Sequence, residues 1–529
     1  MAEHRSWLRP ERLATWATYG VLALTMADNT MVGVAVPNIR DDFRAGVTSL
    51  EWVVAGYIVA FAGLLFTGGM LGDRYGRKKA LLLGVAVFAV GAVVAATAPN
   101  EKVLVAGRVI QGLGAACSEP GTLSLVRQLH PDARRRARAL GGWAAASGVA
   151  LAAGPVAAGL LVAAGGWRAV FWGEFAAATV AGTIGALLLV DSRDPAPGRD
   201  IAGQVCAAVA LASLVYALIA GQDRGFTSPP VAVAWVLSAL AAAGFVLAER
   251  GKHDAVFDLA LLRDPMAASG LLAAATSTFA LFSVLLLVSL DLQVVGGYSG
   301  LATAAVFTPM TLVMVAGGLV GGRWVVARGA RTTLISGLVL AAASLAGLDA
   351  TLGRPVNPVL LAAFLTLMGA GLGLVVAPMV GTVLGRVRPA RSGMAAAAVT
   401  AAREVGGVVG VSVLGAILYA ELFSGLTRRL TDLGIPVGYR SIVIDAVRKG
   451  TKIPTGGGGT GAGHLSLLQR LLAQVKQSVI DKTVDVGKAA YVDGVRSALI
   501  VAVAVLVAGA IGVAILLRHT EDDTPKSVG

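Results

Sequence analysis

The sequence predicts an all-α integral membrane protein, and three observations support this fold class. Hydrophobic residues make up 56% of the 529-residue chain, whereas charged residues make up only 14%. Soluble globular domains carry about 25% charged residues, so this excess of apolar surface has no aqueous explanation. Apolar stretches of about 20 residues, long enough to cross a bilayer as a helix, recur almost from end to end. The 68 glycines suit helices that pack closely in lipid.

The apolar runs predict fourteen transmembrane helices. The first run follows a basic start but is too long for the core of a signal peptide and contains Asp28, so we interpret it as the first span. The predicted spans are 13–36, 51–71, 80–98, 103–126, 139–162, 168–190, 201–221, 230–248, 267–295, 301–322, 332–351, 357–385, 393–421 and 494–517.

The chain contains an internal repeat. The second span ends in GMLGDRYGR at 69–77, and the tenth ends in a shorter but similar sequence, GLVGGR at 318–323. We therefore predict two pseudo-symmetric six-helix bundles, at 1–190 and 267–529, with two linker helices at 191–266. Membrane proteins built from repeats commonly bind their ligand near the bilayer midplane, between the repeats.

The basic residues indicate the orientation of the chain in the cell membrane. The loops at 73–79, 127–138, 323–331 and 386–391 each carry at least three Lys or Arg, and the short loops on the other side carry at most two. This asymmetry places both termini in the cytoplasm. The net charge of +13 thus reflects topology, and we expect no nucleic-acid partner. The two cysteines have neither disulfide nor zinc spacing, so we expect no metal.

One predicted loop, 422–493, is much longer than the others. Its centre at 456–461 is rich in glycine, and the residues after it have an amphipathic helical pattern formed by Leu468, Leu471, Leu472, Val475 and Val479. We expect a surface helix that either caps the outer mouth of a translocation path or forms a passive hairpin.

Four short motifs stand out. At 69–81 the sequence GMLGDRYGRKKAL places Asp73 at a helix end, where it can pair with basic residues of a neighbouring helix, and Gly72 and Gly76 permit a tight turn. The predicted fourth span holds LVAGRVIQGLG at 104–114, the fifth holds Gly154-Pro155, and the first holds DNT at 28–30.

These motifs resemble those of the major facilitator superfamily, and the helix count and first-helix motif resemble its fourteen-span drug:proton antiporter branch. The resemblance implies transport by alternating access, with proton coupling at Arg108 and a helix pivot at Gly154 and Pro155. It also implies a conformational latch formed by Gly69, Gly72, Asp73, Arg74, Gly76 and Arg77. The chain departs from the branch at Gly33, Ala150 and Ala158.

Charged residues inside the spans are the candidate coupling sites. An ionisable group at the bilayer centre costs at least about 2.5–3.5 kcal/mol, so each one is a functional hypothesis. Asp28 and Arg108 lie at similar depth, and we predict a buried pair in which protonation of Asp28 frees Arg108. A static structural pair is the alternative.

Four further carboxylates complete the candidate set. Glu119 stands about three helical turns after Arg108, on the same face of the helix, and precedes Pro120. Glu404 follows Arg403, which could neutralise it within one helix. The other two are Glu174 and Asp291, and these two acids and Glu119 are unusual for the branch.

Competition between a proton and a cation for one buried carboxylate is the simplest antiport mechanism. We therefore predict proton-coupled export of amphipathic or cationic small molecules by a monomer, driven by the proton motive force without a cofactor. The alternatives are a transporter of lipids or endogenous metabolites and a transport-inactive sensor. No phosphate-binding or hydrolase motif is present, so we expect no enzyme activity. Candidate aromatic walls are Tyr57, Phe61, Trp143, Phe279, Phe282 and Phe307.

Overall fold

The computed structural model describes residues 10–43, 47–191, 201–250, 259–292, 296–298, 300–349, 357–388, 391–433, 440 and 467–518. Within these ranges the regular secondary structure is helical, and no strand is present. The predicted all-α fold class is therefore confirmed.

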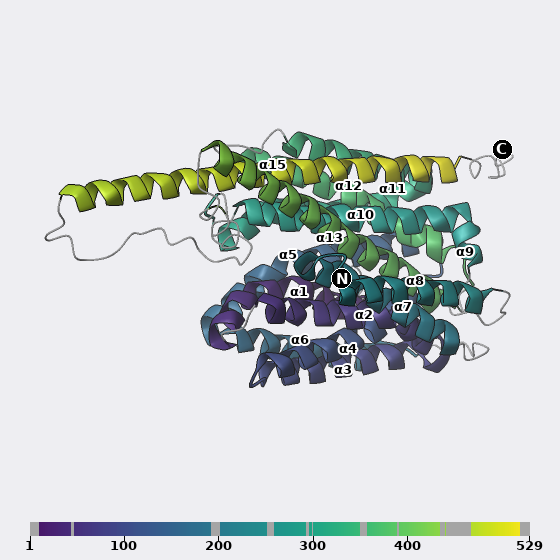
Figure 1. Ribbon diagram of the computed structural model, residues 1–529. Coiled ribbons are helices and arrows are strands. Elements are labelled where there is room, and N and C mark those ends of the chain that lie inside the picture. Colours follow the sequence, from purple (N-terminus) through teal and green to yellow (C-terminus); the bar gives the residue numbers. More distant parts are fainter. Residues whose placement is uncertain are drawn as a thin grey trace, which may run out of the picture.

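The helices gather in two groups, one from each end of the chain (Figure 1). The N-terminal group contains α1 (Pro10–Phe43), α2 (Val47–Tyr75), α3 (Arg77–Ala96), α4 (Glu101–Leu129), α5 (Ala133–Gly165) and α6 (Trp167–Leu188). The C-terminal group contains α10 (Pro265–Leu290), α11 (Gly300–Asp349), α12 (Pro358–Leu384), α13 (Ser392–Asp432) and α15 (Leu467–Leu516).

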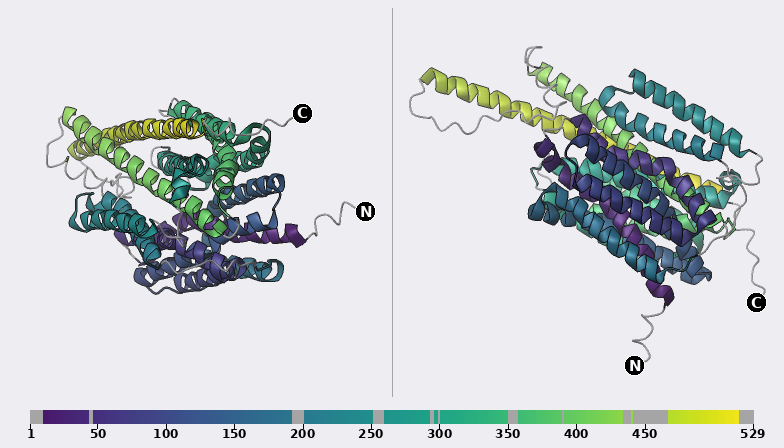
Figure 2. Two further views of the ribbon diagram at one scale, coloured as in Figure 1. Left: turned by 90° about the vertical axis from the view of Figure 1, so that its right-hand side faces the viewer. Right: turned by 90° about the horizontal axis from the view of Figure 1, so that it is seen from below.

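Three helices connect the groups. They are α7 (Ile201–Arg224), α8 (Pro229–Glu249) and the short α9 (Ala260–Arg263). Helix α7 packs against α8 and also against α2 and α13, one helix from each group. Figure 2 shows the same arrangement from two further sides. The linker pair thus lies beside the contact between the two groups.

Among the described residues, twelve helices are long and apolar enough to cross a membrane. Helix α11 is counted once, although its backbone is non-helical at Gly329 (φ 80°, ψ 166°). Helix α4 is not among the twelve, and it carries Arg108 and Glu119 in its middle. The membrane-spanning architecture is established, whereas the predicted number of fourteen spans stays a prediction.

Two predicted loops are largely helical. The predicted loop at 323–331 is helical except at Gly329, where a kink separates the two helices that α11 comprises. The predicted loop at 422–493 begins as the last part of α13, which ends at Asp432, and ends as the first part of α15, which begins at Leu467. The expected surface helix is therefore continuous with the last span, and in Figure 1 it extends past the other helices. The glycine-rich stretch at 456–461 lies outside the described residues.

Helices approach closely where glycine meets a carbonyl group. Pro120 in α4 cannot donate a backbone hydrogen bond to Ala116, four residues earlier. Gly68 of α2 packs against the carbonyl of Ala116, where a side chain would not fit. The same pairing occurs in the C-terminal group, where a Cβ on Gly321 would lie 2.7 Å from the carbonyl oxygen of Leu374. Small residues thus set the distance between helices, as is common in lipid.

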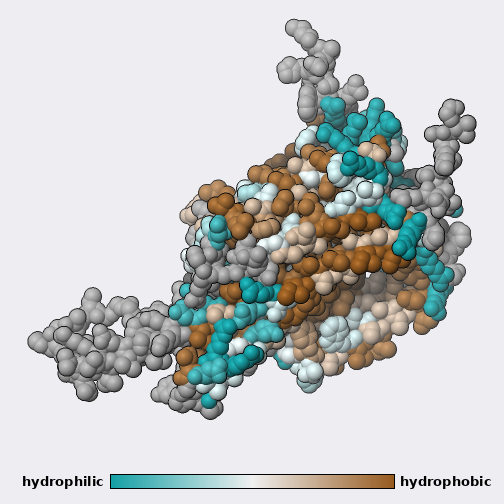
Figure 3. Space-filling view, turned by 90° about the horizontal axis from the view of Figure 1, so that it is seen from above, coloured by the Kyte–Doolittle hydropathy of each residue, from teal (hydrophilic) through white to brown (hydrophobic). Residues whose placement is uncertain are grey.

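The outer surface of the helices is apolar. Leu187 is 78% exposed and Val359 is 77% exposed, and both lie on helices long enough to span a bilayer. Figure 3 shows a broad hydrophobic band between hydrophilic ends. This surface is stable only in contact with lipid, because exposed apolar area on this scale is unfavourable in water.

Helix packing at Gly84 makes a first prediction. A Cβ at this position of α3 would lie 2.6 Å from the carbonyl oxygen of Gly114 in α4. We expect Gly84→Ala to lower the free energy of unfolding by about 1–3 kcal/mol because of overpacking. Gly159 of α5 is the control, since a Cβ there meets no atom within 4 Å. Gly159→Ala should stabilise the helix by about 0.5–1 kcal/mol. Thermal unfolding in detergent measures both, and equal melting temperatures would contradict the packing.

Candidate functional site

The N-terminal group contains a buried ion pair between α1 and α4. Asp28 and Arg108 are 0% and 1% exposed. Arg108 donates through Nη1 to Asp28 Oδ1 and through Nη2 to Asp28 Oδ2, the second bond at 3.1 Å. Its Nε donates to the backbone carbonyl of Val53 at 3.0 Å. The structure thus brings the predicted pair together in a bidentate geometry, which the planar guanidinium of arginine can form with a carboxylate.

A glutamine extends this pair to a second carboxylate. Gln111 lies one turn after Arg108 on α4, and its Oε1 accepts from Arg108 Nη1 at 2.9 Å. Its Nε2 donates to Oε2 of Glu174, on α6, at 2.7 Å. Glu174 is 2% exposed, and its Oε1 has no hydrogen-bond partner. We call Asp28, Arg108, Gln111 and Glu174 the buried acid chain.

Two aromatic side chains form one wall of the buried acid chain. The guanidinium carbon of Arg108 lies 4.6 Å from the ring centroid of Tyr57, a cation–π distance. Tyr57 stacks on Phe61 at 5.8 Å between centroids. The hydroxyl of Tyr57 is buried and has no hydrogen-bond partner. Of the predicted aromatic set, these two lie together beside the candidate coupling residues.

A second pair of charges meets between the two groups of helices. Glu119 of α4 is 0% exposed, and its Oε1 lies 3.9 Å from Nη1 of Arg403 on α13. The guanidinium carbon of Arg403 is 5.5 Å from the ring centroid of Trp143 on α5. The sequence suggested that Arg403 neutralises Glu404 within α13, but the ion pair that the structure forms is with Glu119.

Arg403 is the functional candidate that the predicted site omitted. The sequence signal was present, because an arginine inside an apolar span needs an acidic partner. The partner on the opposite group of helices was not visible from the sequence. Glu404 is 8% exposed and buried in α13 beside it.

The predicted latch joins the two groups at the end of α2. Asp73 accepts from Nε and Nη2 of Arg77 at 3.1 and 3.0 Å. It also accepts from the backbone N–H groups of Gly393 and Met394, at 3.1 and 3.2 Å. Both N–H groups belong to the first turn of α13, so a carboxylate from one group of helices caps a helix of the other.

The glycines of the latch have different roles. Gly76 has a φ of 115° and separates α2 from α3, as the predicted turn requires. Gly72 lies within the helical part of α2, so the prediction that it belongs to the turn is wrong. Gly69 makes the close contact instead, since a Cβ there would lie 2.6 Å from the carbonyl oxygen of Gly393. Arg74 lies over the ring of Tyr75 at 5.4 Å.

The predicted pivot, Gly154-Pro155, lies within the unbroken helix α5. Pro155 lacks an N–H group and leaves the carbonyl of Leu151 without its helical donor. The hydroxyl of Thr30 on α1 lies 3.2 Å from that carbonyl oxygen. Gly154 packs against Ala27, also on α1, where a Cβ would lie 3.0 Å from the carbonyl oxygen. The motif thus joins α5 to α1.

The remaining predicted residues lie in the C-terminal group. Asp291 follows α10, is 1% exposed, and its Oδ1 has no hydrogen-bond partner. Phe279 packs in the core, and Phe282 lies against Gly407. Phe307 is partly buried against the same core as Phe279. The structure therefore does not bring these residues to the buried acid chain.

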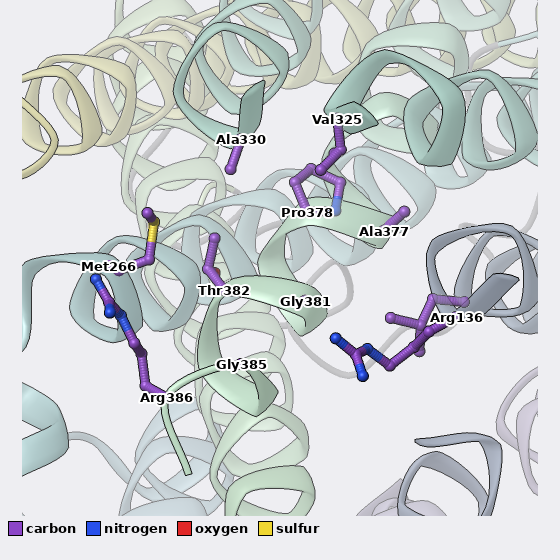
Figure 4. Close-up of a pocket in the computed structure, with 11 residues that line it drawn as sticks. Arg136, Met266, Val325, Ala330, Ala377, Pro378, Gly381, Thr382, Gly385 and Arg386 are labelled. Atoms are coloured by element: carbon purple, nitrogen blue, oxygen red, sulfur yellow. The ribbon is translucent and has the colours of Figure 1, made fainter. Parts of the chain in front are cut away.

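A cavity of about 340 Å³ opens beside the end of α12. Its lining residues come from α5, α10, α11 and α12 and include Pro378 and Gly381. Figure 4 shows Arg136 and Arg386 on opposite sides of this end of α12. Among the described residues that line the cavity, two are arginines and none is an acid. The charge of Arg386 is balanced by Asp264, with 3.4 Å between Nε and Oδ1.

Comparison with known proteins identifies the class of this protein. The family model described as "Major Facilitator Superfamily" matches residues 18–411. The chain belongs to this superfamily of membrane transporters. The arrangement of two helix groups with charged residues buried between them agrees with that assignment.

Several similar proteins are named for drug resistance or export. The multidrug resistance protein Stp of Mycobacterium tuberculosis (strain CDC 1551 / Oshkosh) is 33% identical over 430 residues, covering 80% of this chain and 78% of Stp. The drug efflux pump JefA of the same strain is 31% identical over 499 residues, covering 92% of this chain and 94% of JefA. The tetracenomycin C resistance and export protein of Streptomyces glaucescens is 30% identical, covering 83% and 82%.

Solved structures share the fold at low sequence identity. A bacterial homologue of the human lysosomal transporter Spinster matches with a TM-score of 0.60 at 16% identity, covering 98% of this chain and 100% of that one. The human organic anion transporter MFSD10 matches with a TM-score of 0.56 at 16% identity, covering 77% of this chain and 94% of that one. At this identity the likeness concerns the fold alone.

The buried acid chain makes a second prediction. Because Asp28 and Glu174 share the one guanidinium of Arg108, either acid alone can still balance it. We expect Asp28→Asn or Glu174→Gln to lower the free energy of unfolding by less than about 2 kcal/mol. The double variant leaves an uncompensated buried charge and should lose about 3–5 kcal/mol, more than the sum. Unfolding in detergent measures this coupling, and strictly additive losses would argue against the shared arginine.

The latch makes a third prediction. Asp73→Ala removes the cap from the start of α13, so the ends of the two groups should separate more often. Spin labels on exposed Arg138→Cys and Arg323→Cys, with Cys117 and Cys206 replaced by Ala, report this distance by pulsed electron paramagnetic resonance. We expect a longer distance to gain population in Asp73→Ala.

Two further variants test the specificity of this latch effect. Asp73→Asn keeps one carbonyl acceptor, so its change should be smaller than that of Asp73→Ala. Asp132→Ala is the matched control, because the exposed Asp132 caps the start of its own helix, α5, by accepting from the backbone N–H of Arg135. Similar shifts in Asp132→Ala and Asp73→Ala would contradict a latch at Asp73.

Proposed function

We propose that this transporter exports amphipathic or cationic small molecules across the cell membrane in exchange for protons, by alternating access. The observation that carries the proposal is the buried acid chain. Its two carboxylates share a single guanidinium, which can neutralise only one of them. The set is electrically balanced only when one acid carries a proton, so proton binding is part of its chemistry.

Protonation supplies a way to move helices. Asp28 lies on α1, Arg108 on α4 and Glu174 on α6. A proton on Asp28 removes the attraction that holds Arg108 to α1, and Arg108 can then turn to Glu174 through Gln111. Exchange of the arginine between two acids on different helices connects a proton to a change of helix packing.

The relatives support export as the direction. Proteins similar over most of this chain are named as drug efflux, resistance or export proteins. The acids at the interface, Glu119 and Glu404, would attract a positively charged group, and Trp143 offers an aromatic face. A proton and a cationic cargo can therefore compete for the same carboxylates.

The remaining parts of the proposal follow from charge and topology. The basic loops and both termini face the cytoplasm, in accordance with the positive-inside rule. The latch at Asp73 then joins the two helix groups on the cytoplasmic side and opens when cargo is loaded there. The proton motive force drives the cycle, no cofactor is required, and a monomer contains the complete site.

A transport assay tests this proposal. The purified protein is placed in liposomes, and uptake of ethidium or tetraphenylphosphonium is followed with and without an imposed pH gradient. We expect gradient-dependent flux that falls at least tenfold in Asp28→Asn and Glu119→Gln. Loss of the carboxylate removes either the proton or the cation from the exchange.

The control is Glu421→Gln, which removes an exposed acid from α13 and should leave transport unchanged. Glu404→Gln is its buried counterpart on the same helix and should impair coupling. Flux of equal size with and without the pH gradient would contradict antiport. Full coupling in all the buried-acid variants would contradict the assigned residues.

A further inference from the structure

Glu119 and Arg403 face each other across the two helix groups without satisfying each other. Their nearest atoms, Oε1 and Nη1, are 3.9 Å apart, about 1 Å more than a charge-assisted hydrogen bond. Neither carboxylate oxygen of Glu119 has a hydrogen-bond partner, and neither does Nη1 of Arg403. Buried charged groups normally make such hydrogen bonds. Glu119 can therefore still accept hydrogen bonds, and Arg403 can still donate one.

The surroundings of this pair are held in place. The indole N–H of Trp143 donates to the hydroxyl of Thr122 at 3.0 Å, and that hydroxyl donates to the carbonyl of Glu119 at 2.7 Å. On the opposite side, the hydroxyl of Thr278 donates to the carbonyl of Arg403 at 2.6 Å. These bonds fix the indole ring of Trp143 and the backbone at Glu119 and Arg403, while the carboxylate and the guanidinium keep their own side-chain freedom.

We propose that the Glu119–Arg403 pair binds the zwitterionic part of an aromatic small molecule. A cationic amine of the ligand would bind Glu119, a ligand carboxylate would bind Arg403, and the ring would lie on Trp143. This inference rests on the proposed function as a small-molecule transporter and names the class of substrate. Nη1 of Arg403 and both oxygens of Glu119 then gain the partners that they lack.

A zwitterion fits the pair better than a simple ion. A plain cation can bind Glu119, but it leaves Nη1 of Arg403 without a partner and lies near its positive charge, so we expect it to bind more weakly than a zwitterion. A plain anion at Arg403 would meet the same difficulty with Glu119. Glu404 follows Arg403 directly and adds negative charge near Glu119, which favours the cationic end of the ligand. Only a ligand with both charges satisfies both side chains.

Because the two charges belong to different helix groups, such a ligand also links them. Glu119 is on α4 and Arg403 is on α13. Bound substrate would replace a loose direct contact with two hydrogen-bonded contacts. Substrate selectivity and the approach of the two helix groups thus both depend on the Glu119–Arg403 pair.

Two dyes with the same ring system test the proposal. Rhodamine 110 has a free carboxylate and is zwitterionic, whereas its methyl ester, rhodamine 123, is a cation, and both keep N–H groups that can donate to Glu119. Binding is measured by fluorescence polarisation to the full-length protein in phosphatidylcholine nanodiscs at pH 7. We expect the acid to bind the unmodified protein about tenfold more tightly than the ester, which corresponds to one charge-assisted hydrogen bond.

The variants separate the two charges. Arg403→Gln should weaken the acid about tenfold and leave the ester unchanged or bound more tightly, because the repulsive guanidinium is gone. Arg403→Lys keeps the charge and should retain part of the preference for the acid. Glu119→Gln should weaken both dyes, because it removes the partner of their shared cationic part.

The control is Arg429→Gln, which removes the arginine of the more exposed ion pair with Asp493 and should change neither affinity. Melting temperatures of all variants show whether they are folded. Equal binding of the two dyes to the unmodified protein, no binding of either dye, or equal losses of both in Arg403→Gln would overturn the proposal. Because no pH gradient is applied, failure of proton-coupled transport would not alter this result.

Discussion

The constraint on which this structure depends is the cost of a charge in an apolar interior. Every buried ion needs an opposite charge or several hydrogen-bond partners nearby. The helices are arranged so that most of the buried charged side chains have them. Arg108 meets Asp28 and, through Gln111, Glu174, which draws α1, α4 and α6 together. Asp73 meets the start of α13 and so joins the two helix groups. The same contacts that neutralise the buried charges therefore also hold the helices together.

The backbone has a similar requirement, and it arises where proline and glycine interrupt regular helix packing. A proline within a helix leaves a carbonyl without its donor, and in lipid such a group is costly. The hydroxyl of Thr30 lies near the carbonyl freed by Pro155, and Gly68 lies against the one freed by Pro120. These contacts join α5 to α1 and α4 to α2, next to the buried acids. The residues that shape the backbone thus determine where the charged side chains meet.

The two charge clusters differ in how completely they are satisfied. In the buried acid chain, Arg108 donates hydrogen bonds to Asp28, Gln111 and the carbonyl of Val53 and lies over the ring of Tyr57. Between the helix groups, Glu119 and Arg403 attract each other without a hydrogen bond. A hydrogen-bonded arginine with a second acid nearby suits a switch within one half, because Glu174 has an oxygen without a partner and offers Arg108 an alternative pairing. An unsatisfied pair between the halves suits a ligand, because binding supplies what the protein lacks.

The sequence by itself determined the class of fold, the apolar spans and the Asp28–Arg108 pair, because these follow from hydropathy, helical depth and the cost of a buried charge. It also identified Asp73 and the turn at Gly76. It did not reveal that α13 and α15 extend into the predicted loop at 422–493, since polar residues on a helix and in a loop look alike. Only the tertiary structure decided the partner of Arg403. Helices from opposite halves meet through packing, and the spacing within one helix favoured Glu404, whereas the three-dimensional arrangement placed Glu119 against it.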